Sequence, residues 1–168
     1  MNPAAQLREA FDRSFADLPS HAAAAAERFL AIRIGGHPHA VRMAEISGLF
    51  ADKKITPLPG PVAELIGLVT IRGTLLPVYD LGLLLDCPRA TMPRWLLTAA
   101  AGPVGLAFDQ FDGYLAAQSE PAALGEPPTS PGDRHRRDFL HAGIAQPVVH
   151  LVSVLETIKG LGGHDGLT

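Results

Sequence analysis

The chain has little cysteine, little charge and no long hydrophobic run, and each shortage excludes a class of protein. Its single cysteine, Cys87, excludes an internal disulfide framework and agrees with a reducing cytoplasm. Fourteen basic and seventeen acidic residues give a net charge of −3, which removes the electrostatic case for nucleic acid or an anionic membrane surface as the main partner. No apolar run approaches membrane-spanning length, and the five alanines at 22–26 lie between His21 and Glu27, so we expect no signal peptide.

The sequence also lacks the patterns that accompany catalysis or metal binding. It contains no G-x-S-x-G turn, no Gly-rich nucleotide loop and no H-E-x-x-H helix. The seven histidines have no cysteine or carboxylate at zinc-ligand spacing beside them, so we interpret them as surface or turn residues. Asp109 and Asp112 flank Phe111 beside a predicted turn, where aspartate is common for backbone reasons. We therefore expect no enzyme, no cofactor and no metal site.

What is present indicates a folded chain of short strands and many turns. Apolar residues make up 47% of the 168 residues, and fifteen prolines and seventeen glycines supply frequent turns. Strands are predicted over 29–34, 39–43, 94–100, 104–108, 111–117 and 147–152, with another beginning near 44. Val104, Leu106 and Phe108 share one face of their strand. Many short strands at close spacing favour an all-β barrel architecture, although this pattern does not distinguish one barrel from two.

A tight hairpin is predicted at the centre of the chain. The apolar run Leu65 to Ile71 and the run Thr74 to Asp80 are separated by Arg72 and Gly73, and glycine tolerates the positive φ of a two-residue turn. Arg72 keeps its charge, so it should reach water or a carboxylate. Pro77 cannot donate to a ladder, which indicates an edge strand or a bulge there. Asp80 can cap a short helix that runs through Leu85.

Helices are predicted near both ends of the chain. Asn2 can cap a helix over 2–18, with Pro3 in its first turn and with Leu7, Phe11, Phe15 and Leu18 on roughly one face. This helix either docks, on a partner or on its own domain, or forms a loosely packed tail. Ser153 and Glu156 form a capping box for a closing helix that ends at Gly160.

One long internal segment is predicted to be a mobile surface loop. Residues 119–138 are rich in proline, glycine and charge. Arg134, Arg136 and Arg137 group beside two aspartates, so we interpret them as a solvated loop, with an acidic or phosphate-bearing partner as the alternative.

Several segments of the chain form an ordered set: FLAIRIGGHPHAVRMAEI (29–46), ITPLPG followed after a short spacer by GLVTIRGTLLPVYDL, VGLAFDQFDGYL (104–115) and HAGIAQPVVHLVSVLETI (141–158). This set resembles the CheW-like family of bacterial chemotaxis coupling proteins. These segments cover nearly everything from Phe29 to Ile158. The chain departs from the family in three places: its N-terminal helix, the Pro-rich segment 119–138, and the closing segment, which has GIAQP in place of a longer hairpin.

The resemblance implies an architecture and a role. It implies two intertwined SH3-like β-barrels over 28–160, the second, roughly 90–146, inserted into the first. The flanking residues are predicted from their own sequence, 1–27 as a helical extension and spacer and 161–168 as a frayed tail. It also implies a non-enzymatic adaptor that joins the cytoplasmic tip of a methyl-accepting chemoreceptor to the regulatory domain of a CheA-type histidine kinase. Such an adaptor would be cytoplasmic and recruited to membrane-associated receptor arrays.

Two surfaces are expected to carry that role. Glu45 and Arg72 are lone charges in apolar sequence, and we hypothesise that they lie near one another in a groove between the barrels; alternatively, they form a salt bridge that merely holds the hairpin. The expected receptor-binding residues are Val41, Met43, Glu45, Ile46 and Arg72, and the expected kinase-binding residues are Pro59, Leu65, Gly67 and Phe108. The alternative function is a small-ligand or regulatory sensor that acts without a kinase, which a sizeable apolar cavity with converging polar groups would favour.

Overall fold

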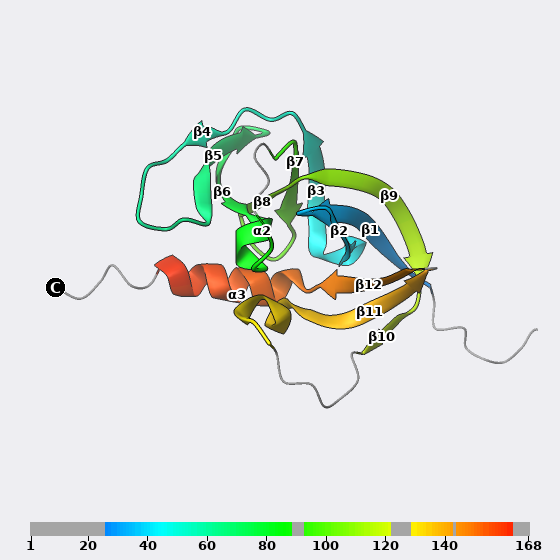
Figure 1. Ribbon diagram of the computed structural model, residues 1–168. Helices are drawn as coiled ribbons and strands as arrows, with labels where there is room; N and C mark the ends of the chain where they lie inside the picture. The colour runs from blue at the N-terminus through cyan, green and yellow to red at the C-terminus, as the bar shows by residue number, and fades with distance from the viewer. Residues whose placement is uncertain (1–25, 89–92, 122–128, 143, 163–168) are drawn as a thin grey trace, which may run out of the picture.

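The computed structural model describes residues 26–88, 93–121, 129–142 and 144–162. In this part of the chain, the strands form two six-stranded sheets (Figure 1). The first sheet has the order β10-β11-β12-β2-β1-β9 and consists of β1 (Glu27–Ile34), β2 (His37–Arg42), β9 (Gln110–Ala117), β10 (Ser119–Pro121), β11 (Arg136–Ala142) and β12 (Ile144–Val149). The second has the order β3-β7-β8-β6-β5-β4 and consists of β3 (Ile46–Ala51), β4 (Thr56–Pro57), β5 (Leu65–Ile71), β6 (Thr74–Asp80), β7 (Trp95–Ala99) and β8 (Gly105–Phe108). Four helical segments accompany the sheets: η1 (Met43–Glu45), α2 (Leu81–Leu84), η2 (Pro131–His135) and α3 (Leu151–Gly162).

Each sheet closes into a small barrel because its two end strands are consecutive along the chain. Only Gln118 separates β9 from β10, the end strands of the first sheet, which we call barrel 1. Residues 52–55 separate β3 from β4, the end strands of the second sheet, which we call barrel 2. Continuous end strands leave a sheet no long free edge. The expected all-β fold of two SH3-like barrels is thus confirmed.

Strand pairing places the boundary between the barrels differently from our expectation. The range 90–146, expected to form the second barrel, is divided by the pairing, because β7 and β8 pair within barrel 2 whereas β9 to β12 belong to barrel 1. Barrel 2 is therefore the continuous segment 46–108, and it is inserted between β2 and β9 of barrel 1. Alternation of apolar residues identifies a strand but does not identify its partner.

The central hairpin forms as predicted. Arg72 and Gly73 have φ angles of 49° and 81°, the two positive values that a two-residue turn of this kind requires. β6 pairs with both β5 and β8, so it is not an edge strand; the ladder with β8 begins at Val78, one residue after Pro77, and the opposite strand β5 carries a bulge. The Asp80 carboxylate accepts a hydrogen bond from Leu83 N at 3.2 Å and caps α2, which confirms the predicted cap.

The segment 119–138 is more ordered than predicted. It contains β10, η2 and the start of β11, and Gly132 and His135 are buried; residues 122–128 lie outside the described part of the chain. Arg136 donates hydrogen bonds to the Leu85 carbonyl and the Cys87 Sγ atom, so it is a packing residue and not part of a solvated loop. The composition of this segment predicted a solvated loop, but an arginine can also be half-buried in a fold when it donates hydrogen bonds to carbonyls at the end of a helix.

The predicted ends of the closing helix also need correction. Helix α3 begins at Leu151, two residues before the predicted cap, and continues past Gly160 to Gly162. Ser153 Oγ bonds His135 Nδ1 at 2.7 Å instead of capping the helix. The predicted helix over 2–18 and the tail over 163–168 lie outside the described residues.

The largest apolar core lies between the barrels and not inside either one. We call it the junction core; its buried members are Leu30, Ile32, Ile34, Val41, Leu81, Leu84, Leu85, Leu97, Ala99, Leu106, Phe108, Val149, Leu151, Val154, Leu155 and Ile158. Smaller clusters fill barrel 2 around Val69, Ile71, Leu76, Val78, Leu96 and Ala107, and barrel 1 around Phe29, Ala40, Leu140 and Val148. Alternate residues of β1 therefore face different cores, and four consecutive residues, 29–32, are buried.

The approach of η2 to α2 gives a test of this packing. A Cβ atom added at Gly132 would lie 2.3 Å from the Leu85 carbonyl oxygen, whereas one added at Gly160 in α3 would meet nothing within 4 Å. Gly132→Ala is expected to lower the free energy of unfolding by about 2 kcal/mol or more, since backbone must move, and Gly160→Ala to raise it by about 0.5–1 kcal/mol through helix propensity. Urea denaturation of both variants checks this. Equal effects of the two substitutions would contradict the close approach.

Candidate partner-binding surfaces

The expected receptor-binding residues occupy three different environments. Val41 is fully buried in the junction core, so no partner can reach it in this structure. Met43 and Ile46 are half-buried and pack against the edge of that core. Arg72 is exposed at the tip of the β5–β6 hairpin. Val41 is therefore the one member of this set that is closed to a partner, since Glu45 is half-buried like Met43 and Ile46.

Glu45 has a structural role that the sequence did not reveal. Its Oε2 atom accepts a hydrogen bond from Leu151 N, the first residue of α3, at 2.9 Å, and its backbone carbonyl accepts one from Ala100 N at 2.9 Å. A carboxylate at a helix N-terminus satisfies a free N–H and complements the helix dipole. No ion pair joins Glu45 to Arg72, so the alternative of a salt bridge between them is wrong.

Arg72 lines an open hollow at one end of barrel 2. The hollow has a volume of about 260 Å³, and Ser47, Phe50, Ile71, Thr74, Leu76, Thr98, Ala99, Gly102 and Pro103 complete its lining. Ala99 lines this hollow, and the next residue, Ala100, donates its N–H to the Glu45 carbonyl. The backbone of Glu45 therefore lies next to the hollow, whereas its carboxylate bonds the start of α3. Arg72 is exposed, so its guanidinium is solvated, which is one of the two environments predicted for it.

The expected kinase-binding residues are likewise divided between surface and interior. Phe108 is 1% exposed within the junction core, and Gly67 is buried where an added Cβ would lie 2.2 Å from the Thr56 carbonyl oxygen. Pro59 is exposed, and Leu65 is half-buried at the start of β5. Only Pro59 and Leu65 of this set are therefore accessible.

Barrel 2 has an exposed apolar face that the sequence analysis of the hairpin did not predict. We call it the strand patch: Leu68, Leu75 and Pro77, which point outward from β5 and β6 opposite the interior residues Val69, Leu76 and Val78. Leu75 is 61% exposed, and nearby Leu58, beyond β4, is 42% exposed. The period-two alternation of the hairpin already contained this signal, because one face of each strand must point away from the interior.

A second apolar surface was invisible to sequence reasoning because its residues come from different barrels. The ring centroids of Trp95 in β7 and Phe111 in β9 are 5.2 Å apart, and those of Phe111 and Tyr114 are 5.3 Å apart. Tyr114 is 66% exposed. We call these three residues the aromatic rim; Trp95 and Phe111 pack against the junction core, as do half-buried Met43, Ile46 and Leu49. Aromatic side chains of this kind dominate the binding energy of many interfaces.

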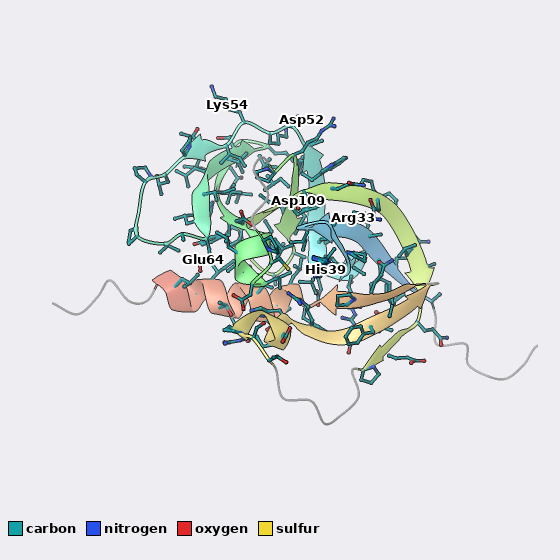
Figure 2. All side chains as sticks on the ribbon, in the orientation of Figure 1. Arg33, His39, Asp52, Lys54, Glu64 and Asp109 are labelled. Carbon is teal, nitrogen blue, oxygen red and sulfur yellow. The ribbon has the colours of Figure 1, made fainter. Side chains whose placement is uncertain are left out.

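A second hollow bears on the sensor alternative. It has a volume of about 430 Å³ and lies beside His37, His39, Cys87, Pro88, Arg136 and Pro147. His39 is 2% exposed; its Nδ1 atom bonds the His37 carbonyl at 3.0 Å, and its Nε2 atom is buried. In Figure 2, His39 lies among the strands of barrel 1, while Asp52 and Lys54 stand at the outer end of barrel 2. Both hollows are open, and neither is an enclosed apolar cavity.

The described residues show no metal-ligand cluster and no membrane-spanning helix. No group of three or more His, Cys, Asp or Glu side chains within them is arranged to hold a metal ion. None of the helices in the described part of the chain has the length and apolar composition needed to cross a membrane.

The capping role of Glu45 predicts a measurable loss of stability. Glu45→Ala is expected to lower the free energy of unfolding by about 1–2 kcal/mol, since the N–H of Leu151 loses its acceptor, and Glu45→Gln is expected to cost less. Glu156→Ala on the exposed face of α3 is the control, with an expected change within about 0.5 kcal/mol. Chemical denaturation measures all three variants. If Glu45→Ala matched Glu156→Ala, the cap would contribute nothing.

Burial of His39 predicts a loss of stability at mildly acidic pH. Burial lowers the pKa of His39 from 6.5 to about 4, so the unfolded chain takes up a proton between these values while the folded chain does not. Stability from this residue is therefore complete above pH 6.5 and is expected to fall by about 2 kcal/mol between pH 7 and pH 5. Urea denaturation at both pH values should show a weaker pH dependence for His39→Leu, and an unchanged one for His37→Leu at the exposed neighbour. Parallel curves for the two variants would refute the assignment to His39.

The comparisons with known proteins identify a family. A family model described as CheW-like domain matches residues 28–154. Among solved structures, the chain is similar to the scaffolding protein TtCheW from Thermoanaerobacter tengcongensis, with a TM-score of 0.65 and 13% identity over 74% of this chain and 89% of that chain. At this identity the likeness shows the fold alone. A search of curated proteins found no match.

The family match spans most of the chain, including both barrels and the start of α3. The matched residues form the strands of both barrels and most of the junction core. The chain therefore belongs to the CheW-like domain family and is a non-enzymatic scaffold or adaptor protein of the chemotaxis class.

Proposed function

We propose that this adaptor couples the cytoplasmic tip of a methyl-accepting chemoreceptor to the regulatory domain of a CheA-type histidine kinase. The observation that carries the proposal is the pair of exposed apolar surfaces, the aromatic rim and the strand patch, held on one body by the junction core. In Figure 1, β5, which carries part of the strand patch, lies at the left of the molecule, whereas β9, which carries part of the rim, arches from its centre to the right edge. Two partners can therefore bind at once.

The aromatic rim fits the helical tip of a receptor. An amphipathic helix binds by placing apolar side chains from successive turns into a groove. The rim offers three aromatic rings in tilted or edge-to-face contact. Met43 and Ile46, two of the residues expected to contact the receptor, pack against the same core. An ion pair between Arg33 and Asp112 at 2.8 Å joins β1 to β9, the strand that carries Phe111 and Tyr114.

The strand patch fits a partner that is itself a β-barrel. Leu75 and Pro77 stand on a regular sheet face, and exposed Leu58 and Pro59 extend this apolar surface beyond β4. Flat apolar sheet faces bury against each other without rearrangement. The family resemblance implies that the kinase regulatory domain has the same fold as this chain. That domain is therefore the partner that we assign to this face. We propose that the protein acts in the cytoplasm at membrane-associated receptor arrays.

Selective loss of each partner tests the proposal. Tyr114→Lys is expected to reduce retention of a receptor tip fragment by at least about tenfold while full-length kinase still binds, and Leu75→Lys is expected to do the opposite. Val152→Lys, at a residue 51% exposed on α3, is the matched control and should retain both partners. A pull-down with both partners from the source cell measures this, with circular dichroism to confirm that each variant folds.

Two results would contradict the proposal. If the wild-type protein retained neither partner under conditions in which a known coupling protein retains both, the adaptor role would fail and the sensor alternative would take its place. If Tyr114→Lys and Leu75→Lys each reduced both interactions equally, the assignment of one surface to each partner would be wrong.

A further inference from the structure

We propose that the second hollow, the one beside His39, binds a small zwitterion of amino-acid size that carries a carboxylate and an ammonium group on the same carbon atom. The hollow lies where the loop after α2 meets β2, β11 and β12 of barrel 1. Its volume of about 430 Å³ is within the range of small-molecule sites. Binding at this site does not depend on the proposed function.

His39 presents an unpaired hydrogen-bond acceptor at this hollow. The residue is 2% exposed, and its Nδ1 atom lies 3.0 Å from the His37 carbonyl oxygen. A carbonyl oxygen can only accept, so Nδ1 carries the hydrogen atom, and burial, which lowers the pKa of His39 to about 4, keeps the ring neutral. Nε2 therefore bears a lone pair, and no group in the described part of the chain bonds it. A buried acceptor without a donor costs free energy, which a donor from a ligand would recover.

Arg136 supplies an unpaired donor at the same hollow. Its Nη2 atom donates to the Leu85 carbonyl and to Cys87 Sγ, whereas its buried Nε atom has no partner among the described residues. The charge of Arg136 contributes to the lowered pKa of His39, so the two side chains lie close together. Both unpaired atoms are covered, and a ligand reaches them when the Arg136 side chain, which is 21% exposed, rotates aside.

The charges of the lining favour a ligand with one charge of each sign. Arg136 and Asp86 are the charged residues that line the hollow. Asp86 Oδ2 accepts a hydrogen bond from Gly132 N at 2.7 Å, which holds the carboxylate in place. A ligand carboxylate can accept from Arg136 while the neighbouring ammonium donates to His39 Nε2 and to Asp86. A dianion would instead face the Asp86 carboxylate without compensation.

Apolar residues form the remaining wall of the hollow. These are Pro38, Pro88, Ala145 and Pro147. They suit a short aliphatic side chain, so L-valine is the probe that we choose. Because the hollow is open and buries only part of a ligand, we expect an affinity on the order of millimolar.

Two exposed alanines provide a matched pair of variants. Ala145 lies in β12 and lines the hollow, whereas Ala116 lies in β9 outside it. In isothermal titration calorimetry with the full-length protein, Ala145→Trp is expected to weaken L-valine binding at least about tenfold, because the indole fills the hollow. Ala116→Trp should bind L-valine as the wild-type protein does. His39→Leu, which removes the acceptor, is expected to weaken binding about tenfold or more.

Two analogues of L-valine test the charge pattern. Isovalerate lacks the ammonium group, and isobutylamine lacks the carboxylate. Each is expected to bind at least about tenfold more weakly than L-valine, since each loses one charged hydrogen-bonding group. Binding of either analogue as tight as that of L-valine would overturn the assignment to a zwitterion.

The remaining outcomes decide whether the site exists. No heat of binding from the wild-type protein at L-valine concentrations up to about 20 mM would overturn it. Equal affinities for the wild-type protein and Ala145→Trp would also overturn it, since L-valine would then bind elsewhere. Circular dichroism checks the fold of each variant, and Ala145→Trp, at an exposed position, decides the question even if His39→Leu fails to fold. A failure of receptor or kinase to bind this protein would leave these results unchanged.

Discussion

The burial of apolar side chains between the two barrels is the interaction on which the rest of this structure depends. Each barrel encloses only a handful of buried residues, whereas the junction core collects residues from both barrels and from both α-helices. Since hydrophobic stabilisation scales with the apolar area removed from water, neither barrel has much stability of its own. The two barrels therefore form a single cooperative body with a fixed relative orientation.

Polar contacts complete this body at its edges. Glu45 connects η1 to the start of α3 and to the strand end at Ala100, so one residue ties together barrel 1, barrel 2 and the closing helix. On barrel 1, Arg42 pairs with Glu27 at 2.9 Å and with Asp138, which also bonds His150. Arg42 and Asp138 are each 18% exposed, and removing one partner of such a pair leaves the other charge poorly solvated. These contacts set the geometry of segments that apolar burial alone would leave free.

A fixed body with two separated apolar surfaces is well suited to a scaffold. The aromatic rim depends on the junction core, because Trp95 and Phe111 come from different barrels and pack against it. The strand patch depends on the hairpin turn at Arg72 and Gly73, which sets which side chains of β5 and β6 face outward.

The amino-acid sequence by itself determined the elements that rest on local chemistry. The hairpin at Arg72 and Gly73, the Asp80 cap and the shared face of Leu106 and Phe108 were all predicted, because turn residues, capping side chains and period-two alternation act within a few residues. The same reasoning, joined to the family resemblance, predicted two barrels and an adaptor. It assigned Met43, Ile46, Pro59 and Leu65 to positions that are accessible in the structure.

Only the tertiary structure decided which strands pair and which apolar residues remain exposed. Val41 and Phe108 resemble surface anchors in sequence, yet both are buried, because the faces of barrel strands that turn away from their own interior meet between the barrels. The contacts of Glu45 with Leu151 and of Trp95 with Phe111 join residues that are distant in sequence or belong to different barrels, so no local pattern contains them. Sequence periodicity states that a face is apolar, and long-range packing alone determines whether that face is covered by the protein or left for a partner.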